Sequence, residues 1–139
     1  MSWDVIIMRF PEGFDGDFDK MPNDWEPETL FTQTYFEEEI KKLFPNVIGD
    51  KTWLTLNAET YSIEFNIGDD DLISNIMLHV RGSNDALKAI EEICMKFNCQ
   101  ALDTTKSKLI DFSEETNEGF ESWRNYKDKV LKKQNNKEK

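Results

Sequence analysis

Five residues in the middle third of the chain could form a site for a small molecule: Trp53, Glu64, Asn66, His79 and Arg81. Apolar and polar residues alternate in the segments that carry them, so strands would present these side chains on one face. A carboxylate beside an imidazole is the minimum for general acid–base catalysis. Arginine near tryptophan can hold an anionic or planar ligand. The sequence therefore predicts a candidate ligand face, and with it a small enzyme or a ligand-binding domain.

The same residues also fit an ordinary sheet surface. Glu64, His79 and Arg81 on adjacent strands can form a half-exposed ion-pair network that fixes the strand register and binds nothing. The sequence contains 1 histidine, which rules out a metal site built from several histidines. The G-x-S-x-G, G-x-G-x-x-G, H-E-x-x-H and P-loop patterns are all missing. The sequence thus identifies no catalytic residue, no metal and no cofactor.

An acidic segment near the N-terminus imitates a calcium-binding loop. Asp15, Asp17 and Asp19 alternate, and Glu26 falls at the twelfth position. Lys20 stands where an EF-hand loop needs glycine for a sharp turn, and it would put a cation beside the metal. We therefore predict a solvated acidic loop and no calcium site.

Acidic and aromatic residues of two loops are the candidates for contact with a protein partner. Residues 69–71 place three like charges in a turn, which favours solubility or contact with a basic partner. The N-terminal loop adds aromatic side chains, of which Phe14, Phe18 and Trp25 are expected to be exposed. The predicted partner-binding residues are Asp15, Asp17, Phe18, Asp19, Trp25, Asp69, Asp70 and Asp71.

The cysteine pattern and the short apolar runs indicate a soluble cytoplasmic protein. Cys94 and Cys99 have neither the spacing of a redox pair nor that of a zinc knuckle, and both are expected in the core as free thiols. The first residues lack the basic and hydrophobic regions of a signal peptide. No apolar run is long enough to span a bilayer.

Sequence periodicity predicts the order strand, helix, three strands, helix, one or two strands, helix. Strands are predicted over residues 3–10, 52–57, 61–67, 75–81, 101–103 and 109–112. The first strand is apolar on both faces, so it is expected in the interior of the sheet.

Three amphipathic helices are predicted. The first begins near Thr34, where Thr34 and Glu37 fit a capping box. The second follows residues 83–85, and the third covers 118–131 before a frayed basic tail at 132–139. The buried stripe of the second helix is predicted to be Leu87, Ile90, Cys94 and Phe97.

These elements predict one α+β domain over residues 1–131. Strands that alternate apolar and polar residues need cover on one side only, so two helices are expected on one face of a mainly antiparallel sheet. The other face should be at least partly open. The long loop over residues 11–31 is expected to be held by aromatic contacts.

Several segments resemble a family of small uncharacterised bacterial proteins that begin with an SWDV-like strand. The most specific pieces are YSIEFN at residues 61–66 and LHVRG at residues 78–82, in addition to SWDV at residues 2–5. That family has no established activity. The resemblance therefore implies a bacterial, cytosolic, single-domain protein and assigns no catalytic residue.

Acidic residues dominate the first 80 positions, which hold seventeen acidic and five basic side chains. The net charge of the whole chain is −11. A surface of this sign repels nucleic acid and anionic membranes, and it attracts a basic protein. We therefore predict a non-enzymatic binding module of the immunity type, which covers a basic toxin or nuclease. The sequence makes no prediction of the oligomeric state.

Overall fold

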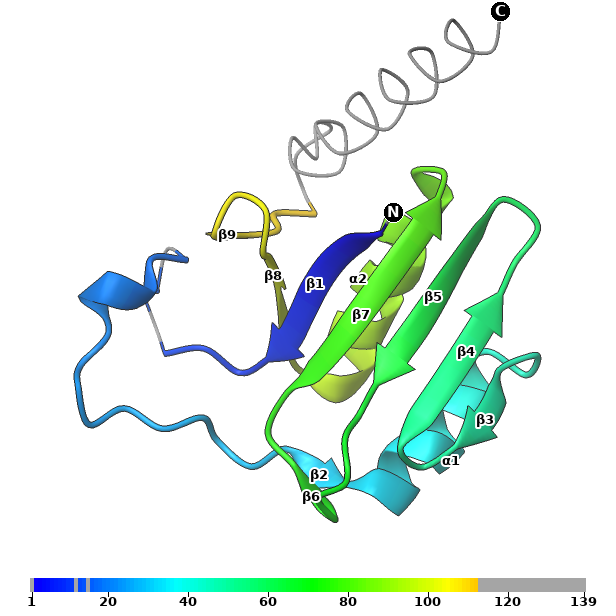
Figure 1. Ribbon diagram of the computed structural model, residues 1–139, viewed down its shortest axis with the longest axis horizontal. Helices are drawn as coiled ribbons and strands as arrows, with labels where there is room; N and C mark the ends of the chain where they lie inside the picture. Colours follow the sequence, from blue (N-terminus) through cyan, green and yellow to red (C-terminus); the bar gives the residue numbers. More distant parts are fainter. Residues whose placement is uncertain (1, 12, 15, 113–139) are drawn as a thin grey trace, which may run out of the picture.

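The computed structural model describes residues 2–11, 13–14 and 16–112 and shows an α+β fold (Figure 1). Its main element is a seven-stranded antiparallel sheet in the order β3-β4-β5-β7-β1-β8-β9. As the sequence predicts, the first strand lies inside the sheet, between β7 and β8. The strands are β1 (Trp3–Met8), β3 (Ile48–Asp50), β4 (Trp53–Asn57), β5 (Tyr61–Asn66), β7 (Ile76–Gly82), β8 (Gln100–Asp103) and β9 (Lys108–Leu109).

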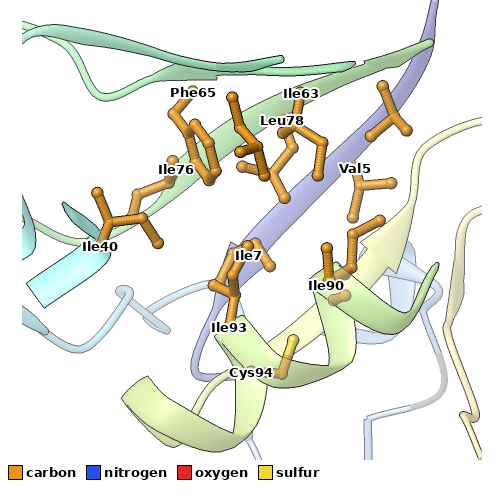
Figure 2. Packing of buried hydrophobic residues seen from close by; sticks show 14 of the residues in the cluster. Val5, Ile7, Ile40, Ile63, Phe65, Ile76, Leu78, Ile90, Ile93 and Cys94 are labelled. Atoms are coloured by element: carbon orange, nitrogen blue, oxygen red, sulfur yellow. The ribbon is translucent and has the colours of Figure 1, made fainter. Parts of the chain in front are cut away.

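Two helices, α1 (Gln33–Leu43) and α2 (Asp85–Phe97), cover one face of this sheet (Figure 1). Figure 2 shows Ile40 of α1 and Ile90 of α2 among the buried side chains of the strands. The predicted stripe of α2 is confirmed, because all four of its residues are buried. The two-layer arrangement therefore follows from the one-sided burial of both helices.

Strand register aligns the buried side chains of neighbouring strands into rows. Phe65 of β5 pairs with Leu78 of β7, and Leu78 pairs with Val5 of β1. None of these three residues is exposed to solvent. Alternate residues of the same strands point to the opposite face, which the helices leave uncovered.

The loop between residues 11 and 30 packs on part of that opposite face, next to β8. Phe14 stacks on Phe10 with ring centroids 4.9 Å apart. Met21 and Trp25 pack against the small buried cluster formed by Met8, Phe10 and Leu102. The prediction of a loop held by aromatic contacts is confirmed. The expectation that Phe14 and Trp25 are exposed is corrected, because both are half-buried where they hold the loop on the sheet.

A second, two-stranded sheet was not predicted from the sequence. It consists of β2 (Phe31–Thr32) and β6 (Leu72–Ile73), which pair antiparallel. The backbone N–H of Leu30 extends the pairing by donating to the carbonyl of Ile73 at 2.8 Å. Strands of two residues are too short to show alternation, so the sequence pattern gave no signal for them.

The first helix begins with a different cap from the one predicted. Thr32 is the N-cap, and its hydroxyl accepts a hydrogen bond from the backbone N–H of Tyr35 at 3.1 Å. The predicted capping box of Thr34 and Glu37 is wrong, because Thr34 already lies in the first turn. Threonine at position 32 satisfies the same rule two residues earlier.

The predicted third helix over residues 118–131 and the tail over 132–139 lie outside the described residues. Among the residues that are described, no helix combines the length and apolar character needed to cross a membrane. Two parts of the fold are considered below as binding surfaces: the sheet face that the helices leave uncovered and the ends of the two helices.

The two buried thiols give the fold a specific pH dependence. Burial raises the pKa of Cys94 to about 12 and the pKa of Cys99 to about 11. An unfolded thiol ionises near pH ~8.5, so above that pH the unfolded chain loses protons that the folded chain keeps. The stability that comes from the neutral thiols is therefore complete below pH ~8.5 and is lost as the pH rises through the folded pKa values.

The free energy of unfolding is expected to fall by up to about 1.4 kcal/mol per pH unit for each thiol above that pH. Urea unfolding at about pH 8 and about pH 10 measures the fall. The double variant Cys94→Ala/Cys99→Ala is the control, because it keeps every other titrating group. The same pH dependence in both proteins would contradict the prediction.

Candidate functional site

The predicted ligand face lies on the side of the sheet that the helices leave uncovered, and we call this surface the open face. In the register, Glu64 pairs with Thr55 on one side and with His79 on the other. His79 in turn pairs with Asp4 of β1. These four residues form one continuous row across β4, β5, β7 and β1.

Trp53 and Asn66 belong to the neighbouring row of the open face. Trp53 pairs with Asn66 of β5 and with Asp50 of β3, and Asn66 pairs with Met77 of β7. Arg81 follows on the other side of the first row, where it pairs with Ser62. The structure thus brings together all five predicted residues on adjacent strands.

His79 is oriented by a carboxylate that sequence reasoning missed. Its Nδ1 lies 2.8 Å from Oδ1 of Asp4. The hydroxyl of Ser2 donates to the same oxygen at 2.8 Å. Because an ionised carboxylate only accepts hydrogen bonds, this contact places a proton on Nδ1 and leaves Nε2 as the second functional nitrogen. The alternation of Asp4 with Trp3 and Val5 was the available signal, but it required knowing that β1 lies beside β7.

The ring of Trp53 covers this imidazole. The ring centroids of Trp53 and His79 are 5.9 Å apart with an angle of 20° between the planes, a stacked arrangement. Trp53 nevertheless keeps 40% of its surface exposed. A large ring that is fixed on one side and open on the other can receive a flat group or a cation from a binding partner.

Glu64 and Arg81 are engaged with each other across β5 and β7. Nη1 of Arg81 lies 3.2 Å from Oε1 of Glu64, and both side chains are partly exposed. Exposed pairs of this kind contribute about 0–1 kcal/mol to stability. This ion pair is consistent with the alternative that the polar residues form a network that fixes strand register. Neither the imidazole of His79 nor Trp53 takes part in the ion pair.

Carboxylates lie at the end of the sheet where Trp53 begins β4. Backbone and side-chain hydrogen bonds from Thr52 hold the pKa of Asp50 below its ordinary value. The carbonyl of Thr52 also accepts from the backbone N–H groups of Ile67 and Gly68, at 3.0 and 3.3 Å. Residues 69–71 therefore start at the same end of the sheet as Asp50. Within the described part of the chain, no basic side chain forms an ion pair with residues 69–71.

The acidic N-terminal loop lies elsewhere. Asp15 is outside the described residues, and Phe18 begins a short 3-10 helix (Phe18–Lys20). The carboxylate of Asp17 accepts from the backbone N–H of Asp19 at 3.0 Å. Figure 1 shows this helix beyond the β9 edge, well apart from β6, so the two acidic segments do not form one surface. The described residues, which omit Asp15, contain no group of three side chains that could hold a metal ion.

One glycine fixes the acidic loop against the sheet edge. Gly16 has a φ of +108°, and a Cβ atom there would lie 2.2 Å from the carbonyl oxygen of Ser107. Any side chain at this position would therefore push the loop away from the turn between β8 and β9. The missing side chain of Gly16 thus allows the loop to approach the sheet edge this closely.

The carboxylate of Asp103 is buried and has a structural role. Asp103 is almost completely buried, and its Oδ1 accepts hydrogen bonds from the indole N–H of Trp3 at 3.0 Å and the backbone N–H of Thr105 at 2.9 Å. It points to the helix side of the sheet, away from the open face, because it pairs with the buried Val5. Its role is to satisfy the Trp3 donor in the core.

Comparison of the chain with protein-family models, with curated proteins and with solved structures finds no match. The resemblance to the family of small bacterial proteins stays a prediction from the residues. The chemistry of the open face is an exposed indole ring with Asp50 beside it, an oriented imidazole and an ion pair. Those groups can hold a cationic or planar group, and the imidazole can exchange a proton.

Proposed function

We propose that the protein is a non-enzymatic binding module that captures a basic protein partner on its open face. The observation that carries the proposal is Trp53, which is 40% exposed in a sheet face and has Asp50 as its register partner. Tryptophan is enriched among the residues that dominate binding energy at protein interfaces. Its ring also attracts arginine and lysine side chains, and the neighbouring carboxylate adds to that attraction.

The composition of the open face supports a protein as the partner. Ile48 is 61% exposed, and its register partner Thr55 lies on this face. An apolar group of Ile48 and Trp53 with charged residues around it has the anatomy of an interface, an apolar centre inside a polar rim. The contact would thus bury apolar surface and satisfy charges at the same time.

The charge of the protein supports a basic partner of the toxin or nuclease type. The chain carries a net charge of −11, and residues 69–71 have no basic partner among the described side chains. Proteins that act on nucleic acids present basic surfaces, and an acidic protein of matching shape covers such a surface. An immunity-type inhibitor works in this way, by steering toward the basic surface and then covering it.

Reversing the charge of residues 69–71 is expected to lower the association rate constant of the partner about tenfold at low salt. The triple variant Asp69→Lys/Asp70→Lys/Asp71→Lys should leave the dissociation rate and the unfolding free energy nearly unchanged, because these side chains are exposed at one end of the sheet. Surface plasmon resonance with the purified partner measures both rates.

The matched control reverses three carboxylates on the helices. Glu38→Lys/Glu91→Lys/Glu92→Lys changes the net charge equally, but at positions on α1 and α2. Equal association rates for the two triple variants would show that only net charge matters and would remove residues 69–71 from the proposal.

A small enzyme or ligand-binding domain is the alternative, and the contact between Asp4 and His79 favours it. A carboxylate that orients an imidazole through Nδ1 leaves Nε2 able to accept or donate a proton to a ligand. A thermal-shift screen of small molecules against the native protein and His79→Ala tests it. A stabilising compound whose effect disappears in His79→Ala would favour this function. A large loss of stability in His79→Ala, with no compound found, would indicate the structural network instead.

A further inference from the structure

A cavity of about 540 Å³ lies where the first turn of α1 approaches the last turn of α2. It belongs to the helical layer and shares no lining residue with the open face, so it is independent of the proposed partner surface. Its volume is in the range of small-molecule sites. Its lining residues are Arg9, Leu30, Phe31, Thr32, Tyr35, Lys96, Phe97 and Asn98.

Three aromatic rings form the apolar wall of this cavity. The ring of Phe31 lies 5.1 Å from that of Phe97 and 5.7 Å from that of Tyr35. Tyr35 meets Phe97 edge to face at 6.5 Å and is 46% exposed. The rings are therefore held by one another while part of their surface faces the cavity, where a further flat ring could pack.

Arg9 provides a fixed cation at the cavity. Its Nε and Nη2 donate to the carbonyls of Asn98 and Phe97 at 3.1 and 3.3 Å, and Nη1 pairs with Glu28 at 3.2 Å. A guanidinium has five N–H groups, so donors are left over after these three contacts. The contacts with the end of α2 fix the guanidinium in place before any ligand arrives.

Lys96 provides a second, more exposed cation. Its Nζ lies 3.2 Å from Oε2 of Glu39, and 41% of the side chain is exposed. An ammonium group has three donors, of which this contact uses one. Thr32, the N-cap of α1, also lines the cavity, and the first turn of α1 carries no acidic residue.

The charged lining of this cavity differs from that of two other cavities. One of those is lined by Glu91 next to Cys94, and the other by Asp85, Lys88 and Glu92. In the cavity between the helix ends, both charged lining residues are basic, in a protein with an excess of acids. Glu28 pairs with Arg9, and Glu39 pairs with both Lys96 and Lys42. These three cations and two carboxylates leave one positive charge, which a monoanion matches better than a dianion such as phosphate.

We propose that this cavity binds an aromatic carboxylate, with the ring against Phe31, Tyr35 and Phe97 and the carboxylate near Lys96 and Arg9. The ligand is either a free aromatic acid or the C-terminus of a peptide that ends in an aromatic residue, since both present the same groups. Charge-assisted hydrogen bonds fix the carboxylate, and ring packing supplies the apolar contact.

Two-dimensional ¹H–¹⁵N NMR titration of the full chain tests the proposal. The probes are 3-phenylpropionate for a free acid and N-acetylphenylalanine for a peptide C-terminus. Saturable shifts are expected at the backbone amides of Tyr35, Phe97 and Asn98, and the tighter probe indicates the source of the natural ligand. The uncharged 3-phenylpropanol should bind about tenfold more weakly than the acid, because it lacks the charge-assisted contact.

Lys96→Gln is expected to weaken the binding of both acids about fivefold, since it removes the charge but keeps the stem of the side chain. Lys88→Gln is the matched control, because Lys88 lies on the same helix and lines a different cavity. Circular dichroism verifies that both variants fold. Absence of saturable shifts with either acid, equal binding of the alcohol, or equal binding by the native protein and Lys96→Gln would each overturn the proposal.

Discussion

Trp53→Ala is expected to weaken binding of the partner by about 30-fold or more, equivalent to about 2 kcal/mol of binding free energy. The indole is the largest exposed ring of the open face, and its stacking on His79 fixes its orientation before the partner binds. Truncation removes both the buried apolar area and the ring face that would receive a cation. Isothermal titration calorimetry with the purified partner measures the loss.

Two comparisons separate a binding effect from a folding effect. Trp53→Phe should keep part of the affinity, because it retains a ring of smaller area. Met95→Ala removes a side chain that is 75% exposed on α2, in the opposite layer, and should leave affinity unchanged. If Trp53→Ala bound the partner as tightly as the native protein, the open face would not be the interface.

Phe36→Ala is expected to lower the free energy of unfolding by about 3–5 kcal/mol, a large part of the stability of an ordinary domain. Phe36 has no exposed surface, and its ring packs 4.9 Å from that of Phe97, 5.6 Å from Phe31 and 6.0 Å from Phe65. The ring thus links α1 to α2 and to the sheet, and its loss leaves a cavity that these elements cannot close. Urea unfolding followed by circular dichroism measures the change.

Phe36→Leu is the control for cavity size, because leucine fills most of the volume and should cost much less than alanine. Phe31 and Phe97, which contact Phe36, also line the cavity between the helix ends. Substitution of Phe36 should therefore also alter the binding of the aromatic acids there. A destabilisation of under about 1 kcal/mol for Phe36→Ala would contradict the described packing of α1.

Local sequence patterns were sufficient to predict the strands and helices that have one buried side and one exposed side. In Tyr61–Asn66, every second residue meets the helices and the others meet solvent, so alternation gave the strand and its two faces. The helix stripe from Leu87 to Phe97 was equally clear, because α2 buries one side only. The candidate ligand face followed from the same alternation.

Contacts between distant segments were not predictable from such patterns. Asp4 meets His79, and Trp3 meets Asp103, only because β1 lies between β7 and β8. That strand order depends on the tertiary fold, and no local periodicity encodes it. The same limit explains why Trp25 was expected to be exposed: its contact with the sheet depends on the path of the loop between residues 11 and 30.

The most direct test of the binding proposal is an affinity capture from a lysate of the source organism at low and at moderate salt. Three tagged proteins are used as bait: the native chain, Trp53→Ala and Met95→Ala. We expect the native chain and Met95→Ala to retain the same basic protein in stoichiometric amount, with less retained as salt rises. Trp53→Ala should lose it. Capture of that protein by all three baits, or of no basic protein at either salt concentration, would contradict the proposal that the open face binds a basic partner.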